Sequence, residues 1–442
     1  MGKLESFAKL SAFQYVAQIV TIVSAIFYSF IAANVLGPEK YGLIYYLMGF
    51  LVGIPSIFGV ETFYDLAKVF FAKYKSRSLV RKIVFPTLFF LLVLTVASVF
   101  FSEQVVGFAG KGTKELVVLF SAVIFFVPLL IFFQSVLVGF KQFGKLLLLV
   151  FVQKTLDLTF LLIFLFVLKQ DYLSLFYSTI LSTIIVLLLT VFYISKLDFS
   201  QIIVPDKEIN KFLSQSWISN VAKGLMVQVE IWVFGFLLIL SDFGVFYLIK
   251  KLSTYLFETP QVAISEVILP FLSEEEKVEK LILYASKVVK FQIILNIFIA
   301  IFSLLLAPFV LPLLFPEFLA GVMIFPIIAL GYTLYFGAPL SRLLKATNNN
   351  NMLTLAYVLY IVLTIIFGFI LIPSQGLVGA AITLFISRVM FGVSLYFICR
   401  YKGYKIDLIP TYPDIVFFYS KGIALLIRGF LAVKKLLFVK KK

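Results

Sequence analysis

Long apolar runs dominate the chain and recur at near-regular intervals. Most are 18 to 25 residues long, which as a helix is enough to cross about 30 Å of hydrocarbon. None alternates over roughly ten residues as a transmembrane barrel strand would. The pattern predicts an all-α polytopic membrane protein with spans at 10–33, 41–64, 79–101, 115–139, 146–168, 172–195, 213–239, 243–266, 291–314, 321–341, 352–372 and 377–399.

The first run, Leu10 to Ala33, is expected to be a retained span. It is longer than a signal-peptide core and lacks a small-residue cleavage site. The connections between spans are short, so we expect no soluble domain.

Lysine and arginine fall almost entirely on one side of the expected bundle. With the N-terminus inside, 22 basic residues lie in or beside cytoplasmic segments, and only four lie outside, at Lys40, Lys111, Lys114 and Lys169. Cytoplasmic loops of membrane proteins carry such an excess. We therefore expect a multi-pass plasma-membrane protein with both termini cytoplasmic.

The amino-acid composition excludes several classes of partner and of catalytic site. Apolar residues make up 62% of the chain, charged residues 14%, and the net charge is +16. The loop bias accounts for that charge, so no nucleic-acid partner is expected. One cysteine and no histidine exclude an intramolecular disulfide, cysteine metal clusters and the Ser-His nucleophile pair. We expect no catalytic residue, no metal, no cofactor and no enzymatic activity.

The two halves of the chain repeat each other at a nearly constant offset. Tyr41-Gly42 matches Phe243-Gly244, Gly139 to Gln142 matches Leu344 to Thr347, and Lys169 to Tyr172 matches Pro373 to Gly376, at offsets of 202, 205 and 204. Six spans per half give parallel repeats, with a path between two lobes. The expected domains are an N-lobe (1–196), a cytoplasmic linker (197–212), a C-lobe (213–405) and a C-terminal segment (406–442).

Two motifs carry a family resemblance over roughly residues 10 to 400. The turn from Val35 to Leu43, VLGPEKYGL, resembles the LGPxxYG turn of prokaryotic polysaccharide flippases in the multidrug/oligosaccharidyl-lipid/polysaccharide exporter superfamily. Gln228 to Gly235 followed by Asp242 to Phe246 is similar to that family's Q-x-D-R-x-x-x-G…G-x-Y pattern, with Glu230 at the acidic position and Ile231 in place of arginine.

The resemblance implies a V-shaped, two-lobed bundle that moves a polyprenyl-linked oligosaccharide from the inner to the outer leaflet. The same architecture serves ion-coupled drug antiporters, which are the main alternative. A membrane polysaccharide polymerase or ligase and a non-transporting scaffold are weaker alternatives, and a monomer is expected. Proton coupling, sodium coupling and a gradient of the carrier itself all stay open as driving forces.

Ionisable residues inside spans cost about 2.5–3.5 kcal/mol each at the bilayer centre and are rarely left facing lipid. Lys223 and Glu230 share one helix face, as do Lys251 and Glu258, because seven residues are almost two turns. If spans 213–239 and 243–266 form an antiparallel hairpin that turns near Ser241, their charges form either a two-rung ladder of ion pairs or two charged levels on one cavity wall. Its rungs would be Glu230 with Lys251 and Lys223 with Glu258.

Three interpretations of these charges stay open: salt bridges within the hairpin, snorkelling of Lys250 and Lys251 about 10 Å from the outer surface, and a cavity for an anionic head group. The cavity candidates have a basic surplus: Lys223, Lys250, Lys251 and Arg388 against Glu230 and Glu258. That sign favours a phosphate or pyrophosphate cargo, whereas a drug/cation antiporter would need an acidic cavity.

The remaining intramembrane charges have structural interpretations. Arg388 is expected to pair with an acid on another span, such as Asp157 or Glu61. Lys154 can neutralise Asp157 three residues away. Glu61 and Asp65 are expected in an interfacial ion-pair cluster or in a gate.

The C-terminal stretch carries a basic stripe with a seven-residue repeat, at Lys421, Arg428, Lys435 and Lys442. We expect an amphipathic helix lying on the cytoplasmic membrane surface, attracted by anionic lipid. A thirteenth span at 414–433 is the alternative.

Overall fold

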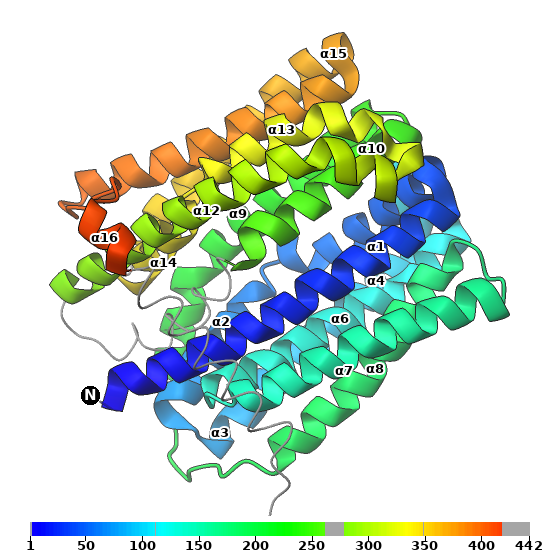
Figure 1. The fold of residues 1–442 in the computed structure, drawn as a ribbon. Helices are drawn as coiled ribbons and strands as arrows, with labels where there is room; N and C mark the ends of the chain where they lie inside the picture. The colour runs from blue at the N-terminus through cyan, green and yellow to red at the C-terminus, as the bar shows by residue number, and fades with distance from the viewer. Residues whose placement is uncertain (1, 111, 261–277, 348, 418–442) are drawn as a thin grey trace, which may run out of the picture.

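The computed structural model describes residues 2–110, 112–260, 278–347 and 349–417, which are mostly helical. One group of helices comprises α1 (Gly2–Ile57), α2 (Glu61–Tyr74), α3 (Arg77–Leu79), η1 (Val80–Val84), α4 (Phe85–Phe100), α5 (Ser102–Ala109), α6 (Lys114–Gly139), α7 (Phe143–Leu162), η2 (Ile163–Val167) and α8 (Leu173–Ser195). The other comprises α9 (Asp206–Leu237), α10 (Leu240–Ser253), η3 (Thr254–Glu258), α12 (Val278–Leu314), η4 (Pro316–Phe318), α13 (Ala320–Thr333), α14 (Gly337–Ala346), α15 (Asn350–Tyr401) and α16 (Tyr412–Phe417). Figure 1 shows the two groups as two lobes lying side by side.

The described helices account for the twelve expected spans. Nine of them are long and apolar enough to cross a membrane. Two of these nine hold two spans each, since α1 breaks at Gly37 (φ 70°) and α15 breaks at Gly376 (φ 55°). Left-handed backbone is natural for glycine, so the chain reverses there without a loop. With α10, where span 243–266 begins, the all-α, twelve-span fold class is confirmed.

Two spans end or break where the sequence pattern did not show it. Span 41–64 is not one helix, because α1 ends at Ile57 and α2 begins at Glu61. Span 321–341 is likewise split between α13 and α14. Amide side chains of α12 donate to backbone carbonyls at the second break: Gln292 to that of Tyr335 and Asn296 to that of Tyr332. Such partners make irregular backbone tolerable inside a membrane protein.

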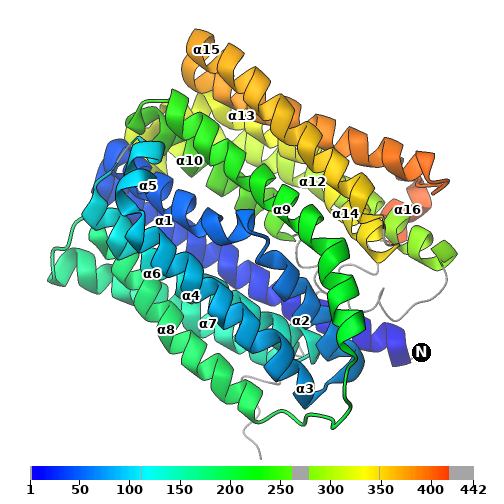
Figure 2. The same cartoon turned by 180° about the vertical axis from the view of Figure 1, so that it is seen from behind.

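The lobes meet along the second half of α1, which packs against α9 and α10, while α9 also touches α2 (Figure 2). Glycines bring these helices together. A Cβ on Gly42 would lie 2.2 Å from the carbonyl oxygen of Leu240, and one on Gly244 would lie 2.0 Å from that of Pro38. The two contacts are reciprocal at the offset of 202 residues. That reciprocity is what a two-fold axis between duplicated halves produces.

The outer faces of the bundle are apolar. Large side chains on α4, α8 and α12 are exposed, among them Phe89, Leu188, Phe309 and Leu313. Since no water-soluble domain presents such a surface, these faces contact lipid.

Candidate functional site

Four charges gather inside the C-lobe. Glu230 on α9 pairs with Lys250 on α10 and accepts a hydrogen bond from the Tyr360 hydroxyl of α15. Arg388 on α15 pairs with Glu258 of η3 and lies 3.6 Å from Glu230. Two cations thus balance two carboxylates, which is what a cluster this deep requires.

Neither rung of the expected ladder exists: in the first, Glu230 pairs with Lys250 instead of Lys251. The second rung is wrong, because Lys223 pairs with Glu61 of the other lobe and Glu258 pairs with Arg388. One residue is a turn of about 100° around a helix, so Lys251 faces away from Glu230.

Arg388 was expected to pair with an acid on another span, and this is confirmed, because its partners are Glu258 of η3 and Glu230 of α9. The two examples named for it, Asp157 and Glu61, are not its partners. Snorkelling of the two lysines is also wrong: the Lys250 side chain is 14% exposed and ion-paired, and Lys251 turns toward the other lobe.

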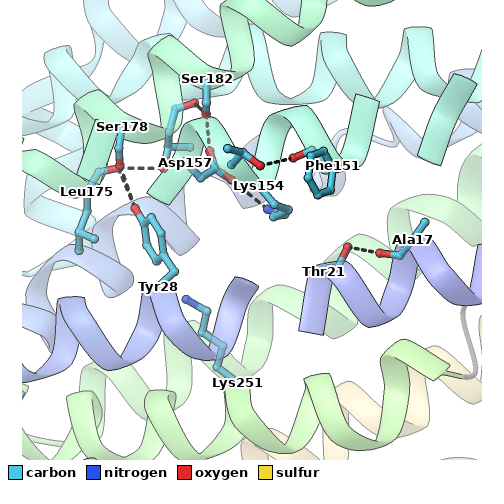
Figure 3. A network of polar contacts seen from close by, with 12 residues as sticks. Ala17, Thr21, Tyr28, Phe151, Lys154, Asp157, Leu175, Ser178, Ser182 and Lys251 are labelled. Carbon is cyan, nitrogen blue, oxygen red and sulfur yellow. Dashed lines mark hydrogen bonds and ion pairs between the residues drawn. The ribbon is translucent and has the colours of Figure 1, made fainter. Parts of the chain in front are cut away.

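Lys251 reaches from the C-lobe to the N-lobe. Its Nζ donates to the Tyr45 hydroxyl at 2.8 Å and lies 4.1 Å from the Tyr45 ring centroid and 5.8 Å from that of Tyr28. Figure 3 shows the ammonium group directed at Tyr28. Among the described residues, no carboxylate forms an ion pair with it. Lys251 therefore lies between the lobes, and its printed contacts there are the Tyr45 hydroxyl and the rings of Tyr45 and Tyr28.

The N-lobe has a polar network on α7 and α8, close to Tyr28 and Lys251 (Figure 3). Lys154 pairs with Asp157 at 3.0 Å, the local pair that the sequence suggested. Asp157 also accepts from the Ser182 hydroxyl, and the Tyr28 hydroxyl lies 3.0 Å from that of Ser178. The Lys154 and Asp157 charges cancel, so they add no net charge opposite Lys251.

A second set of charges crosses between the lobes at the end of the bundle that holds the N-terminus. Glu61 on α2 pairs with Lys223 on α9, and Asp65 on α2 pairs with Lys345 on α14 at 2.9 Å. Asn220 bridges them, accepting from Lys345 at 2.9 Å and donating to Thr62 at 3.1 Å. Glu61 and Asp65 therefore do form an ion-pair cluster, and its partners come from the opposite lobe.

Sequence reasoning missed several members of these clusters. Lys345 was counted only as a loop charge, and nothing marked Asn220. Tyr28, Tyr45 and Tyr360 lie in spans rich in aromatic residues and carry no motif. Their roles depend on which helices meet, which a single sequence does not show.

The start of the C-terminal segment, which follows the last span, is bound to Lys290 of α12. Lys290 pairs with Asp407 at 2.6 Å and with Asp414 at 3.0 Å. Hydrogen bonds from Thr411, together with Lys290, lower the pKa of Asp414 to about 2, so its carboxylate stays ionised throughout the physiological range. The structure describes this segment only up to residue 417, so the expected surface helix and most of the alternative span 414–433 lie outside the described residues.

No protein-family model and no curated protein matches this chain. Solved structures match over most of its length. An outward-facing multidrug resistance MATE family transporter of the MOP superfamily is 16% identical, covering 90% of this chain and 96% of its own, with a TM-score of 0.69. A MOP superfamily transporter from Pyrococcus furiosus, described as having a binding pocket of reverse polarity, is also 16% identical, covering 90% and 95%, with a TM-score of 0.70.

The structure is that of a polytopic membrane protein made of two six-helix lobes. Its fold is the one found in MATE transporters of the MOP superfamily.

Proposed function

We propose that this protein is a flippase that moves a polyprenyl-(pyro)phosphate-linked oligosaccharide from the inner to the outer leaflet by alternating access of its two lobes. The observation that carries this proposal is Lys251, a lysine that lies between the lobes and forms no ion pair within the described residues. An anionic group entering between the lobes would find a cation there with no carboxylate to displace.

The charge balance elsewhere supports an anionic cargo. In the C-lobe, Lys250 and Arg388 cancel Glu230 and Glu258. In the N-lobe, Lys154 cancels Asp157. Of the four basic residues expected to make the cavity positive, Lys223, Lys250 and Arg388 are ion-paired, and Lys251 is the one without an ion pair among the described residues.

The alternative of an ion-coupled drug antiporter has less support. A cationic drug needs an acidic surface between the lobes, yet each carboxylate of these clusters pairs with a lysine or arginine. The Pyrococcus furiosus transporter, with its pocket of reverse polarity, is consistent with a fold that serves cargoes of either charge.

Two lobes suit a lipid-linked sugar physically. The sugar and phosphate must avoid hydrocarbon while the polyprenyl tail stays in it, and a lateral opening between lobes permits both. Rocking about the glycine contact of Gly42 with Gly244 would alternate access. In this proposal the membrane is the plasma membrane, both termini are cytoplasmic, and the C-terminal segment contacts anionic lipid.

Deleting the gene in its native host tests this function. The expected result is accumulation of a lipid-linked oligosaccharide on the inner leaflet, reversed by the wild-type gene. A polymerase defect would instead leave unpolymerised glycan on the outer leaflet, and a scaffold or drug antiporter would leave the lipid-linked pool unchanged. Either of those results would contradict the proposal.

A further inference from the structure

Two tyrosine rings stack across the boundary between the lobes, next to Lys251. Tyr45 of α1 and Tyr247 of α10 have ring centroids 4.9 Å apart and ring planes 22° apart. Each ring also has an aromatic neighbour in its own lobe: Tyr41 lies 4.4 Å from Tyr45, and Phe243 lies 5.9 Å from Tyr247. If the lobes separate, each ring keeps that neighbour and loses only the ring opposite, so two aromatic faces open between the lobes.

The Tyr247 ring and the Lys251 ammonium group lie on one face of α10. The two residues are four positions apart, which places them about 6 Å apart along the helix axis and on the same side of it. Both contact Tyr45, since Tyr247 stacks on its ring and Lys251 donates to its hydroxyl at 2.8 Å. In the proposed function Lys251 contacts the cargo phosphate. The first sugar is bonded directly to that phosphate, so it falls at the Tyr247 ring.

The groups around these rings suit a sugar. A pyranose has a face of C–H groups that packs on an aromatic ring, and its hydroxyls need hydrogen-bond partners. Such partners are present on the N-lobe side, where the side chains of Lys154 and Asp157 are 26% and 13% exposed. Figure 3 shows Lys251 directed from the C-lobe toward Tyr28, with Lys154 and Asp157 on the N-lobe side. Aromatic rings with a few polar groups are the usual lining of a small-molecule site.

The polyprenyl tail is the other part of the cargo that an aromatic surface can hold. The tail has no hydrogen-bonding group, so packing it here would take Lys154 and Asp157 out of water without offering them new partners, which costs free energy. The apolar outer faces of α4, α8 and α12 already suit a hydrocarbon chain. The sugar therefore fits these rings better than the tail does.

We propose that Tyr247, together with Tyr45, forms a subsite for the first sugar of the cargo, a pyranose joined directly to the phosphate that Lys251 contacts. This inference rests on the proposed function. It divides recognition between two neighbouring residues of α10: Lys251 contacts the phosphate, which every cargo of this class carries, and Tyr247 determines which first sugar is accepted.

Calorimetry on the purified full-length protein in nanodiscs tests the subsite. The probes are farnesyl pyrophosphate and the same lipid carrying one glucose, one galactose or one N-acetylglucosamine. At least one of the three sugars is expected to raise the affinity about tenfold over the sugar-free lipid, which is the size of one aromatic packing contact. No gain from any of the three overturns the proposal. This comparison needs no variant, so it stands even if a tyrosine variant fails to fold.

Substitution of Tyr247 identifies the residue responsible. Tyr247→Leu removes the ring and is expected to lose the whole sugar gain while its affinity for farnesyl pyrophosphate stays unchanged, whereas Tyr247→Phe keeps the ring and should keep the gain. Phe176→Leu is the matched control, because Phe176 of α8 stacks on Phe120 of α6 at 4.9 Å and 25° within the N-lobe. Its sugar gain should equal that of wild type.

Two results with Tyr247→Leu overturn the proposal. One is a sugar gain equal to that of wild type, which means that the ring does not contact the sugar. The other is an equal loss of affinity for the sugar-free and the sugar-bearing lipid, which means that the ring only packs the lobes together or holds the tail.

The failures of the two proposals are distinguishable. Lys251→Gln is expected to bind both lipids about tenfold more weakly, the effect of one charge-assisted hydrogen bond, and to keep the sugar gain. Weaker binding of both lipids by Lys251→Gln, with no sugar gain in the wild-type protein, contradicts the sugar subsite alone. A sugar gain that depends on Tyr247, in a protein that transports no lipid-linked glycan, contradicts the proposed function.

Discussion

Arg388→Met is expected to lower the free energy of unfolding by about 3–5 kcal/mol, the effect of leaving a buried charge without its partner. Arg388 contacts both Glu230 and Glu258, and its side chain is 10% exposed. Methionine fills similar space but leaves the two carboxylates with only Lys250 to offset them. Thermal unfolding in detergent, followed by intrinsic fluorescence, measures the loss.

Lys40→Met is the matched control. The pair of Lys40 with Asp171 has side chains that are 53% and 46% exposed, and a pair so open to solvent contributes at most about 1 kcal/mol. Adding Glu258→Gln to Arg388→Met should recover part of the stability, because it removes one uncompensated charge. Equal losses in Arg388→Met and Lys40→Met would show that the C-lobe cluster is not a balanced unit.

Gly42→Ala is expected to reduce transport at least tenfold. Its Cβ would lie 2.2 Å from the Leu240 carbonyl oxygen, closer than any packed atoms approach, so the helices must separate. Overpacking of this kind costs about 1–3 kcal/mol, and here the cost falls on the contact about which the lobes are proposed to rock. Transport of lipid-linked glycan in proteoliposomes gives the readout.

Gly107→Ala controls for the change of residue type, because nothing lies within 4 Å of the added atom. It should transport normally and be slightly more stable, since alanine favours a helix over glycine. Gly244→Ala, the partner at the offset of 202, should repeat the defect of Gly42→Ala. Normal transport by both variants would contradict the proposed rocking contact.

The lengths of the apolar runs were enough to predict most of the fold, because the thickness of the membrane hydrocarbon fixes how long a spanning helix must be. The duplication also showed in the sequence, since Tyr41-Gly42 and Phe243-Gly244 repeat a turn whose glycines then meet. The position of the break after Ile57 could not be read from the apolar run, because such a run looks the same whether its helix is continuous or split.

The site was harder to predict, for physical reasons. The ladder argument found the charges of one hairpin, but a shift of one residue decides whether Lys250 or Lys251 faces Glu230. The partners of Lys223 and Arg388 come from helices far away in the sequence, Glu61 and Glu258. Charge spacing within one hairpin carries no information about those neighbours, so the ion pairs between the lobes appear only once the helices are packed.

Reconstitution of the purified protein in liposomes, with a fluorescent polyprenyl-pyrophosphate-linked oligosaccharide followed from one leaflet to the other, tests the central claim most directly. The wild-type protein is predicted to move the lipid, Lys251→Gln to move it at least tenfold more slowly through loss of the central phosphate contact, and Lys40→Gln to match wild type. Movement no faster than in protein-free liposomes, or a Lys251→Gln rate equal to wild type, would contradict the account.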